Sequence, residues 1–154
     1  QFEQETGRKL QVCFEPGKYL VSQCGYFLVK TNVVKQTPAT VFVGVNSGFN
    51  HLIRPMFYDA YHHISNLSNH TGTKRLYTVV GNICETDTFA WDRSLPEVRE
   101  GDLLAFYNAG AYGFEMASNF NARLKPAEVL VEGNEHRLIR RRDQFDDLLR
   151  NQVL

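Results

Sequence analysis

Turn-forming residues divide this chain into many short apolar segments. Glycine, proline and asparagine gather at Glu15-Pro16-Gly17, Asn46-Ser47-Gly48 and Gly133-Asn134, and the segments between such turns are rich in β-branched and aromatic residues. Segments of this length and composition favour strands. Many short strands separated by turns predict an all-β fold, a barrel or sandwich, closed by a short C-terminal helix.

The expected strands run from one end of the chain to the other. We expect single strands at 10–14, 39–45, 76–83, 103–107, 127–131 and 136–140, and a two-stranded stretch at 19–36 that bends at Gly25. Residues 1–9 are expected to finish a helix that stops at Gly7.

Three other segments complete the expected organisation. Residues 51–64 are broken by Pro55 and are expected to form an irregular loop with room for one helical turn, and residues 86–98 a plain loop. Asp143 is expected to cap a final amphipathic helix over 144–150.

Composition indicates an ordinary soluble domain. The 154 residues are 43% hydrophobic and 22% charged, with 17 basic and 17 acidic side chains. Because these charges cancel, no global field recruits nucleic acid or an anionic membrane. The basic run 137–142 contains apolar residues and is followed by acids, which favours a solvated strand edge over a phosphate site.

The cysteines and histidines argue against disulfides and metals. Cys13, Cys24 and Cys84 are odd in number and lack metal-type spacing, which favours a reducing compartment, the cytoplasm. Cys13 and Cys24 lie in apolar patterns and are expected to be core residues. The histidines between 51 and 70 have no acidic or cysteine partners at ligand spacing, so no metal site is predicted.

Several side chains suit chemistry. Cys84 precedes Glu85, and a carboxylate beside a thiol favours a protonated thiol, a proton donor, although a lone cysteine is more often a small core residue. Arg54 lies among aromatic residues, where a guanidinium suits a bidentate carboxylate or is a plain surface charge. Tyr112 stands between glycines in Gly110-Ala111-Tyr112-Gly113, where it either packs on a planar ligand or covers the core.

Four long stretches together resemble the C-terminal β-domain of the diaminopimelate decarboxylases, which are fold-type III pyridoxal-phosphate enzymes. They are EPGKYLVSQCGYFLVKTNVVKQ, NSGFNHLIRPMFYDAYHHI, YTVVGNICETDTFAWDR and EGDLLAFYNAGAYGFEMASNFNARLKPAEVLV. They extend in family order from Glu15 to Val131. The resemblance therefore covers nearly the whole chain.

The resemblance implies a role for each matching residue. In the Glu-Pro-Gly-Lys turn it implies cofactor contacts from Glu15, Gly17 and Lys18, with Lys18 also at a substrate carboxylate where the family more often has arginine. Elsewhere it implies substrate contacts from Arg54 and Tyr58, a proton donor in Cys84, a partner for the substrate ammonium in Glu85, and a contact to cofactor and substrate from Tyr112. We expect Arg54, Tyr58, Cys84 and Tyr112 to share one face.

The chemistry of diaminopimelate agrees with these roles. Its distal end carries an amino group and a carboxylate, and Arg54 with Lys18, and Glu85, supply a partner for each. A decarboxylase of ornithine or lysine meets no distal carboxylate and has no use for Arg54. After carbon dioxide leaves, the substrate carbon needs a proton, which a positioned thiol can give.

The resemblance also implies partners. The family's Schiff-base lysine and glycine-rich phosphate loop lie in an N-terminal (β/α)8 barrel, so we expect residues 1–14 to be the last helix and strand of that barrel and 15–154 to be the C-terminal β-barrel domain of a longer protein. The family is typically a head-to-tail dimer, in which Cys84 and Glu85 serve the partner's cofactor.

The sequence thus predicts the C-terminal domain of an enzyme that uses pyridoxal 5'-phosphate to convert meso-2,6-diaminopimelate to L-lysine, and that is inactive without the barrel. Two alternatives stay open. One is a decarboxylase of a modified diaminopimelate, with a wider pocket around Arg54, Met56 and Tyr58. The other is a non-catalytic β-module that binds a partner chain, in which Cys84 and Glu85 are buried scaffold residues.

Overall fold

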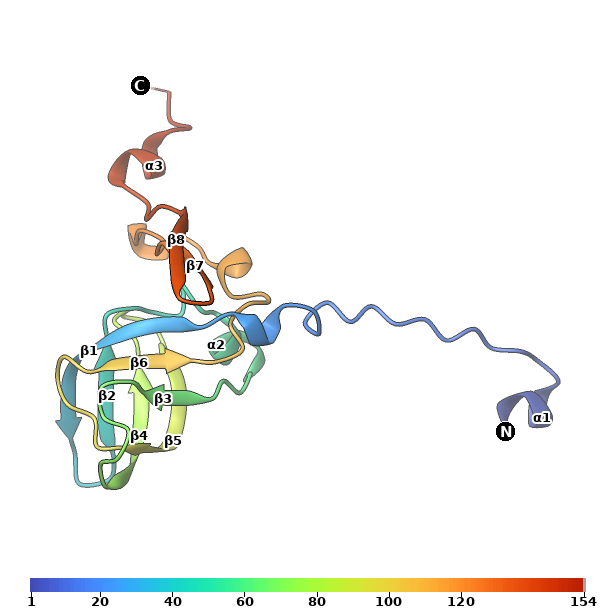
Figure 1. Ribbon diagram of the computed structural model, residues 1–154, viewed down its shortest axis with the longest axis horizontal. Helices are drawn as coiled ribbons and strands as arrows, with labels where there is room; N and C mark the ends of the chain where they lie inside the picture. The colour runs from blue at the N-terminus through green and yellow to red at the C-terminus, as the bar shows by residue number, and fades with distance from the viewer. Residues whose placement is uncertain (154) are drawn as a thin grey trace.

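The computed structural model describes residues 1–153 and contains a six-stranded sheet that curls into a nearly closed barrel (Figure 1). Its strands are β1 (Phe27–Gln36), β2 (Val41–Val45), β3 (Ile64–Asn66), β4 (Lys74–Val80), β5 (Thr88–Pro96) and β6 (Leu103–Phe106). Their order is β3-β6-β1-β2-β4-β5, and the two edge strands, β3 and β5, contact each other. The expected all-β barrel is confirmed.

The sheet is antiparallel except where β2 pairs with β4. A parallel pair needs a crossover connection, because a tight turn reverses the chain. Here the crossover spans 46–73 and includes β3 and the one-turn helix α2 (Arg54–Tyr58). The expected helical turn in 51–64 is confirmed, and Figure 1 shows α2 at the barrel end that the N-terminal segment reaches.

The core fills the barrel interior. Val43, Val79, Leu104 and Phe106 have no exposed surface, and Tyr77 is also fully buried. The Tyr77 hydroxyl accepts a hydrogen bond from Val98 N at 3.1 Å, so its polar atom is satisfied inside the core.

Residues 86–98 were expected to be a loop, and this prediction is wrong. They contain β5, which pairs with β4 along its length. Asp92, Arg93, Ser94 and Pro96 gave the segment the composition of a turn. An edge strand tolerates such residues, and the register shifts opposite Tyr77 and Val79 absorb the irregularity.

The expected two-stranded stretch at 19–36 is also wrong. Only β1 is a strand, and a single 3₁₀ turn, Ser22–Cys24, precedes it. The bend at Gly25 is present for a packing reason: a Cβ placed on Gly25 would lie 2.3 Å from Gly110 Cα. Only two glycines allow these backbones to approach so closely.

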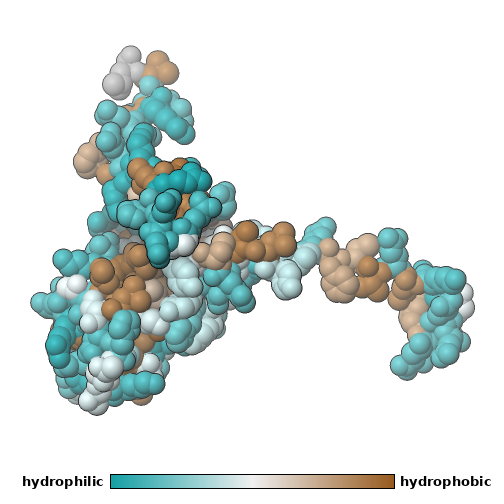
Figure 2. All heavy atoms as spheres, viewed as in Figure 1, coloured by the Kyte–Doolittle hydropathy of each residue, from teal (hydrophilic) through white to brown (hydrophobic). Residues whose placement is uncertain are grey.

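The N-terminal segment extends away from the barrel (Figure 1). Helix α1 (Phe2–Thr6) ends as expected at Gly7, which has a φ of 69°. Residues 10–14 form no strand, because no neighbouring strand within residues 1–153 offers them a hydrogen-bond ladder. Their apolar side chains are exposed, and Figure 2 shows apolar surface along this arm. Cys13 and Cys24 are exposed as well, so their expected burial is wrong.

The C-terminal part forms the expected hairpin, β7 (Glu128–Glu132) and β8 (Glu135–Arg140), around Gly133. Helix α3 (Phe145–Leu149) follows, but its N-cap is Gln144, which forms a capping box with Asp147. Asp143 instead accepts hydrogen bonds from Asn119 Nδ2 at 3.0 Å and Lys125 N at 3.1 Å. None of the helices in residues 1–153 is long and apolar enough to cross a membrane.

Substitution of two adjacent leucines on β6 tests which face of the strand packs into the core. Leu104 is fully buried and Leu103 is 47% exposed. We expect Leu104→Ala to lower the free energy of unfolding by about 2–5 kcal/mol, because it leaves a cavity. The same change at Leu103 should cost less than about 1 kcal/mol. Urea denaturation of the two variants measures both, and equal costs would contradict the barrel's inward and outward faces.

Candidate active site

Arg54 opens α2 and carries a positive charge. Its Cζ lies 5.5 Å from the ring centroid of Tyr58 and 5.9 Å from that of Tyr112. Its Nε is buried and makes no hydrogen bond within the described residues, and no carboxylate among them pairs with the guanidinium. A cation held between two aromatic rings, with donors to spare, is suited to binding an anion.

The glycine-flanked turn that carries Tyr112 is held rigidly against the N-terminal segment. Gly110 N donates to Ser22 O at 3.1 Å, and a Cβ on Gly110 would lie 2.0 Å from Val21 O. Tyr112 itself has a φ of 57°, which is rare for a residue with a side chain. Within residues 1–153 the backbone N–H groups of 111–113 donate no hydrogen bond. Successive free N–H groups suit an anion such as phosphate.

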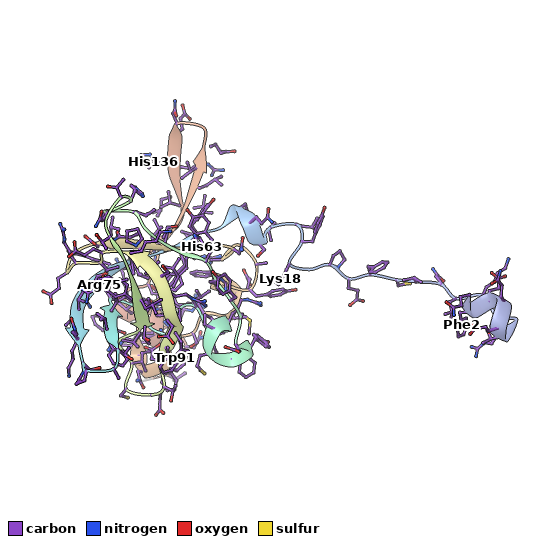
Figure 3. The ribbon with its side chains drawn as sticks, turned by 90° about the horizontal axis from the view of Figure 1, so that it is seen from below. Phe2, Lys18, His63, Arg75, Trp91 and His136 are labelled. Atoms are coloured by element: carbon purple, nitrogen blue, oxygen red, sulfur yellow. The ribbon has the colours of Figure 1, made fainter. Side chains whose placement is uncertain are left out.

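The Glu-Pro-Gly-Lys turn touches the same phenol. A Cβ placed on Gly17 would lie 2.3 Å from Tyr112 Oη, so only glycine lets this backbone pass the tyrosine. Glu15 and Lys18 are exposed beside it. Figure 3 shows Lys18 where the N-terminal arm reaches the barrel. Five expected site residues, Glu15, Gly17, Lys18, Arg54 and Tyr112, therefore come from three separate segments to one end of the barrel, with Tyr58 against Arg54.

His62 also belongs to this region, and the sequence did not reveal it. It is 3% exposed, and its Nδ1 donates to Tyr107 O at 2.8 Å, which leaves Nε2 as an acceptor. That Nε2 is buried without a partner. Burial lowers the pKa of His62; the hydrogen bond to Tyr107 O acts against this, and the charges of Arg54 and Lys18 add to the lowering. A neutral imidazole therefore stands beside two cations. The neighbouring His63 is exposed, and no sequence pattern distinguishes which of the two histidines is buried.

Cys84 and Glu85 lie in the turn between β4 and β5. The strand ends at Val80, so Cys84 follows it within the turn and does not end the strand as expected. Both side chains are exposed, which contradicts the burial expected of a non-catalytic scaffold. Cys84 Sγ accepts a hydrogen bond from Asn121 Nδ2 at 3.7 Å. Glu85 forms no ion pair or hydrogen bond with the described residues.

The buried carboxylate of Asp87 shapes this turn. Its Oδ1 accepts a hydrogen bond from Phe49 N at 2.7 Å and its Oδ2 one from Ile83 N at 2.9 Å. A Cβ on Gly81 would lie 2.0 Å from the same Oδ2, so the backbone closes tightly around it. Burial raises the pKa of Asp87, while the two hydrogen bonds act against that rise. Sequence reasoning assigned this residue no role, because both partners are backbone atoms and one of them, Phe49 N, lies 38 residues away in the chain.

The side chains with chemistry fall into two groups. Arg54, Tyr58 and Tyr112 lie around the Gly17 turn, and Cys84 lies beside Asn121. No hydrogen bond or ring contact within residues 1–153 joins the groups. No cluster of three or more His, Cys, Asp or Glu side chains that could hold a metal ion occurs in the same range.

Comparison with known proteins identifies relatives along nearly the whole chain. The family model described as "Pyridoxal-dependent decarboxylase, C-terminal sheet domain" matches residues 18–110. A diaminopimelate decarboxylase from Methanothermobacter thermautotrophicus is 45% identical over 152 residues, which are 97% of this chain and 35% of the relative. One from Neisseria meningitidis serogroup B is 44% identical over 95% of this chain and 35% of its own length. The chain thus spans about a third of these relatives.

Solved structures agree with the sequences. The crystal structure of diaminopimelate decarboxylase from M. jannaschii superposes with a TM-score of 0.85 at 41% identity, over 91% of this chain and 32% of that one. A co-complex of that enzyme with L-lysine gives a TM-score of 0.85 at 40% identity, over the same shares. A lysine/ornithine decarboxylase from Vibrio vulnificus, at 20% identity and a TM-score of 0.62 over 70% of this chain and 30% of that one, shares the fold.

Buried, neutral His62 predicts a loss of stability in acid. A pKa lowered by folding gives stability that is complete above the ordinary histidine value, about 6.5, and is lost as the pH falls toward the folded pKa. The free energy of unfolding should therefore fall between pH 7.5 and 5. Part of this slope should disappear in His62→Gln, while the rest remains because His51 also has a pKa lowered by burial.

The matched control is His136→Gln, because His136 is exposed on the hairpin away from the barrel (Figure 3). Denaturant titrations at several pH values measure the slopes. The slope for His136→Gln should equal that of the original chain. If His62→Gln also keeps the full slope, His62 is not held neutral by burial.

Proposed function

This chain belongs to the pyridoxal-dependent decarboxylases as their C-terminal sheet domain, and we propose on that basis that it serves the decarboxylation of meso-2,6-diaminopimelate to L-lysine. The relatives that match nearly all of it are diaminopimelate decarboxylases. The observation that carries the choice of substrate is Arg54, a cation that lies near the rings of Tyr58 and Tyr112 and forms no ion pair within residues 1–153.

Arg54 supports a substrate with a carboxylate at its far end. Its guanidinium has no acid to satisfy it within residues 1–153, so a substrate carboxylate would supply the missing partner. Lys18 brings a second positive charge to the region, and His62 stays neutral. A neutral His62 leaves its Nε2 as an acceptor and keeps a third positive charge away from the substrate ammonium.

The turns around Tyr112 fit a phosphate-bearing planar cofactor. The free N–H groups of 111–113 suit a phosphate, and the Tyr112 ring offers a flat surface. Glu15 and Lys18 stand exposed at the edge of the same region. Pyridoxal phosphate, when bound, supplies an electron sink for the pair left when carbon dioxide departs. The lysine that holds it covalently has no counterpart in this chain, so we assign that lysine to a separate barrel.

Cys84 and Glu85 have different tasks in this proposal. Cys84 holds a proton at Sγ and gives it to the substrate carbon that has lost carbon dioxide. Glu85 is exposed and unpaired, and it binds the substrate ammonium throughout the reaction. The exposure of both residues supports a role toward a bound molecule and speaks against the non-catalytic module.

We further propose that the active site is completed by other polypeptide. The relatives are about three times as long as the part that this chain matches, since it covers 35% of each, which leaves room for an N-terminal barrel. Residues 1–14, exposed and without a strand partner, would join that barrel. Two separate groups of side chains are what a head-to-tail dimer needs, with Arg54 and Tyr112 serving one site and Cys84 and Glu85 the other. Three free cysteines support a cytoplasmic location.

Arg54→Lys tests the substrate in the protein assembled with its barrel and cofactor. Lysine keeps the charge and loses the planar fork, so kcat/KM for diaminopimelate should fall about tenfold to hundredfold. Decarboxylation of ornithine, measured alongside by carbon dioxide release, should change little. An equal loss for both substrates would show that Arg54 does not bind a distal carboxylate. A preference for a conjugated diaminopimelate over the free one would favour the modified-substrate alternative.

Cys84→Ala tests the proton donor. We expect kcat to fall about a hundred- to ten-thousand-fold while KM stays nearly constant, because the thiol acts in a chemical step. Glu85→Gln should mainly raise KM, because the charge that it pairs with is present from binding onward. Steady-state kinetics on both variants separate the two effects. Normal turnover in Cys84→Ala would assign the proton to another donor.

A further inference from the structure

The thiol of Cys84 is held by a residue from a distant segment. Asn121, 37 residues later in the chain, donates from Nδ2 to Cys84 Sγ at 3.7 Å. Both side chains are exposed, so nothing but this contact and the local backbone fixes the direction of the thiol. This hydrogen bond is therefore the contact in the turn around Cys84 that acts directly on the sulfur atom.

The backbone of Asn121 adopts an uncommon conformation to make this contact. Asn121 and Ala122 have φ values of 56° and 54°, in the left-handed region. Asparagine tolerates this region better than most residues, but alanine rarely enters it, so the surrounding structure must impose it. Strain of this kind persists only where neighbouring contacts determine the backbone.

Contacts on both sides of Asn121 supply that constraint. Ahead of it, Ser118 N donates to Asn50 O at 2.7 Å, and the rings of Phe120 and Phe49 lie 5.2 Å apart. After it, Arg123 Nη2 donates to Asn82 O at 3.3 Å. The segment is thus fastened to the crossover at 49–50 and to the Cys84 turn at Asn82.

The Cys84 turn is fastened from its other side to the same crossover. Asp87 accepts hydrogen bonds from Phe49 N and Ile83 N, and Asn82 N donates to Ser47 O at 2.9 Å. The segments that carry Cys84 and Asn121 are therefore both bound to residues 47–50. These contacts hold the backbones of both segments against the same part of the crossover.

We propose that Asn121 is a positioning residue for the Cys84 thiol. It directs Sγ and stabilises the charge that sulfur acquires when the thiol acts. In that step the S–H bond breaks, its proton forms a C–H bond with the electron pair of the decarboxylated substrate carbon, and the S–H electron pair remains on sulfur. A hydrogen bond donated to sulfur favours this thiolate. The catalytic half of this inference rests on the proposed function, whereas the effect on the thiol does not.

The test compares the rate at which iodoacetamide alkylates Cys84 at pH 7.5 in the original chain and in two Asn121 variants. Mass spectrometry of the Cys84 peptide measures the rate. Asn121→Asp keeps the size of the side chain but replaces the donor by an anion. Asn121→Gly removes the side chain and accepts a positive φ without strain, so it keeps the backbone. Because the thiolate is the reacting form, both variants should alkylate Cys84 about twofold to tenfold more slowly. In the assembled enzyme kcat should fall while KM is preserved.

Internal and matched controls are available. Cys13 and Cys24, exposed in the same sample, should react at unchanged rates, so that a slower reaction at Cys84 alone reports the loss of the Asn121 contact. Asn108 is an exposed asparagine with a φ of 59° and no side-chain hydrogen bond within the described residues, so Asn108→Asp should leave Cys84 alkylation unchanged.

The possible outcomes are distinct. Unchanged or faster alkylation of Cys84 in both Asn121 variants would overturn the proposal, because the amide would then only cover the sulfur. Slower alkylation in an enzyme that does not decarboxylate diaminopimelate would keep Asn121 as the partner of the thiol and refute the proposed function. Slower alkylation together with a lower kcat supports both.

Discussion

The parallel pairing of β2 with β4 is the constraint on which the arrangement of this molecule depends. Because a tight turn cannot join parallel neighbours, the chain must cross the end of the barrel between them. That crossover carries Arg54 and His62, and its first residues, 47–50, receive the Cys84 turn and the segment of Asn121. Both groups of side chains with chemistry are therefore attached to one connection, even though no contact joins the groups directly.

Irregular backbone usually leaves N–H and C=O groups without a strand partner. In and around the crossover, buried polar side chains form hydrogen bonds with such groups. Asn50 is 1% exposed and donates from Nδ2 to Ser118 O, while Asp87 accepts two backbone N–H groups. Each of these side chains replaces the hydrogen bonds that a strand partner would give. Removing Asp87 would leave two backbone N–H donors without their acceptor, and removing Asn50 would leave the Ser118 carbonyl without this donor, so the exposed residues of the site depend on buried ones behind them.

Local sequence patterns predicted what local physics determines. Gly133 and the apolar alternation around it gave the hairpin, Pro55 allowed one helical turn, and Gly7 ended the first helix. Tertiary contacts decided the rest. Asp92 and Pro96 led to the prediction of a loop where β5 lies, because an edge strand accepts residues that a central strand rejects. Among the site residues, the resemblance supplied the roles. The contacts of His62 with Tyr107, of Asn121 with Cys84 and of Asp87 with Phe49 escaped notice because they join residues 45, 37 and 38 positions apart.

The two groups of side chains, one around Arg54 and one around Cys84, also differ in charge. Within residues 1–153 Arg54 pairs with no carboxylate and Glu85 pairs with no cation, although the chain as a whole is neutral. Among the residues that the structure describes, four ion pairs form between other arginines and acids, so opposite charges do meet here where geometry allows. Arg54 and Glu85 are kept from such pairing by their places on different turns. A substrate with a carboxylate and an ammonium at its distal end satisfies both, and a head-to-tail pair of chains would bring the two turns to one molecule. The separation of these charges, like the separation of the side chains, supports the proposed dimer.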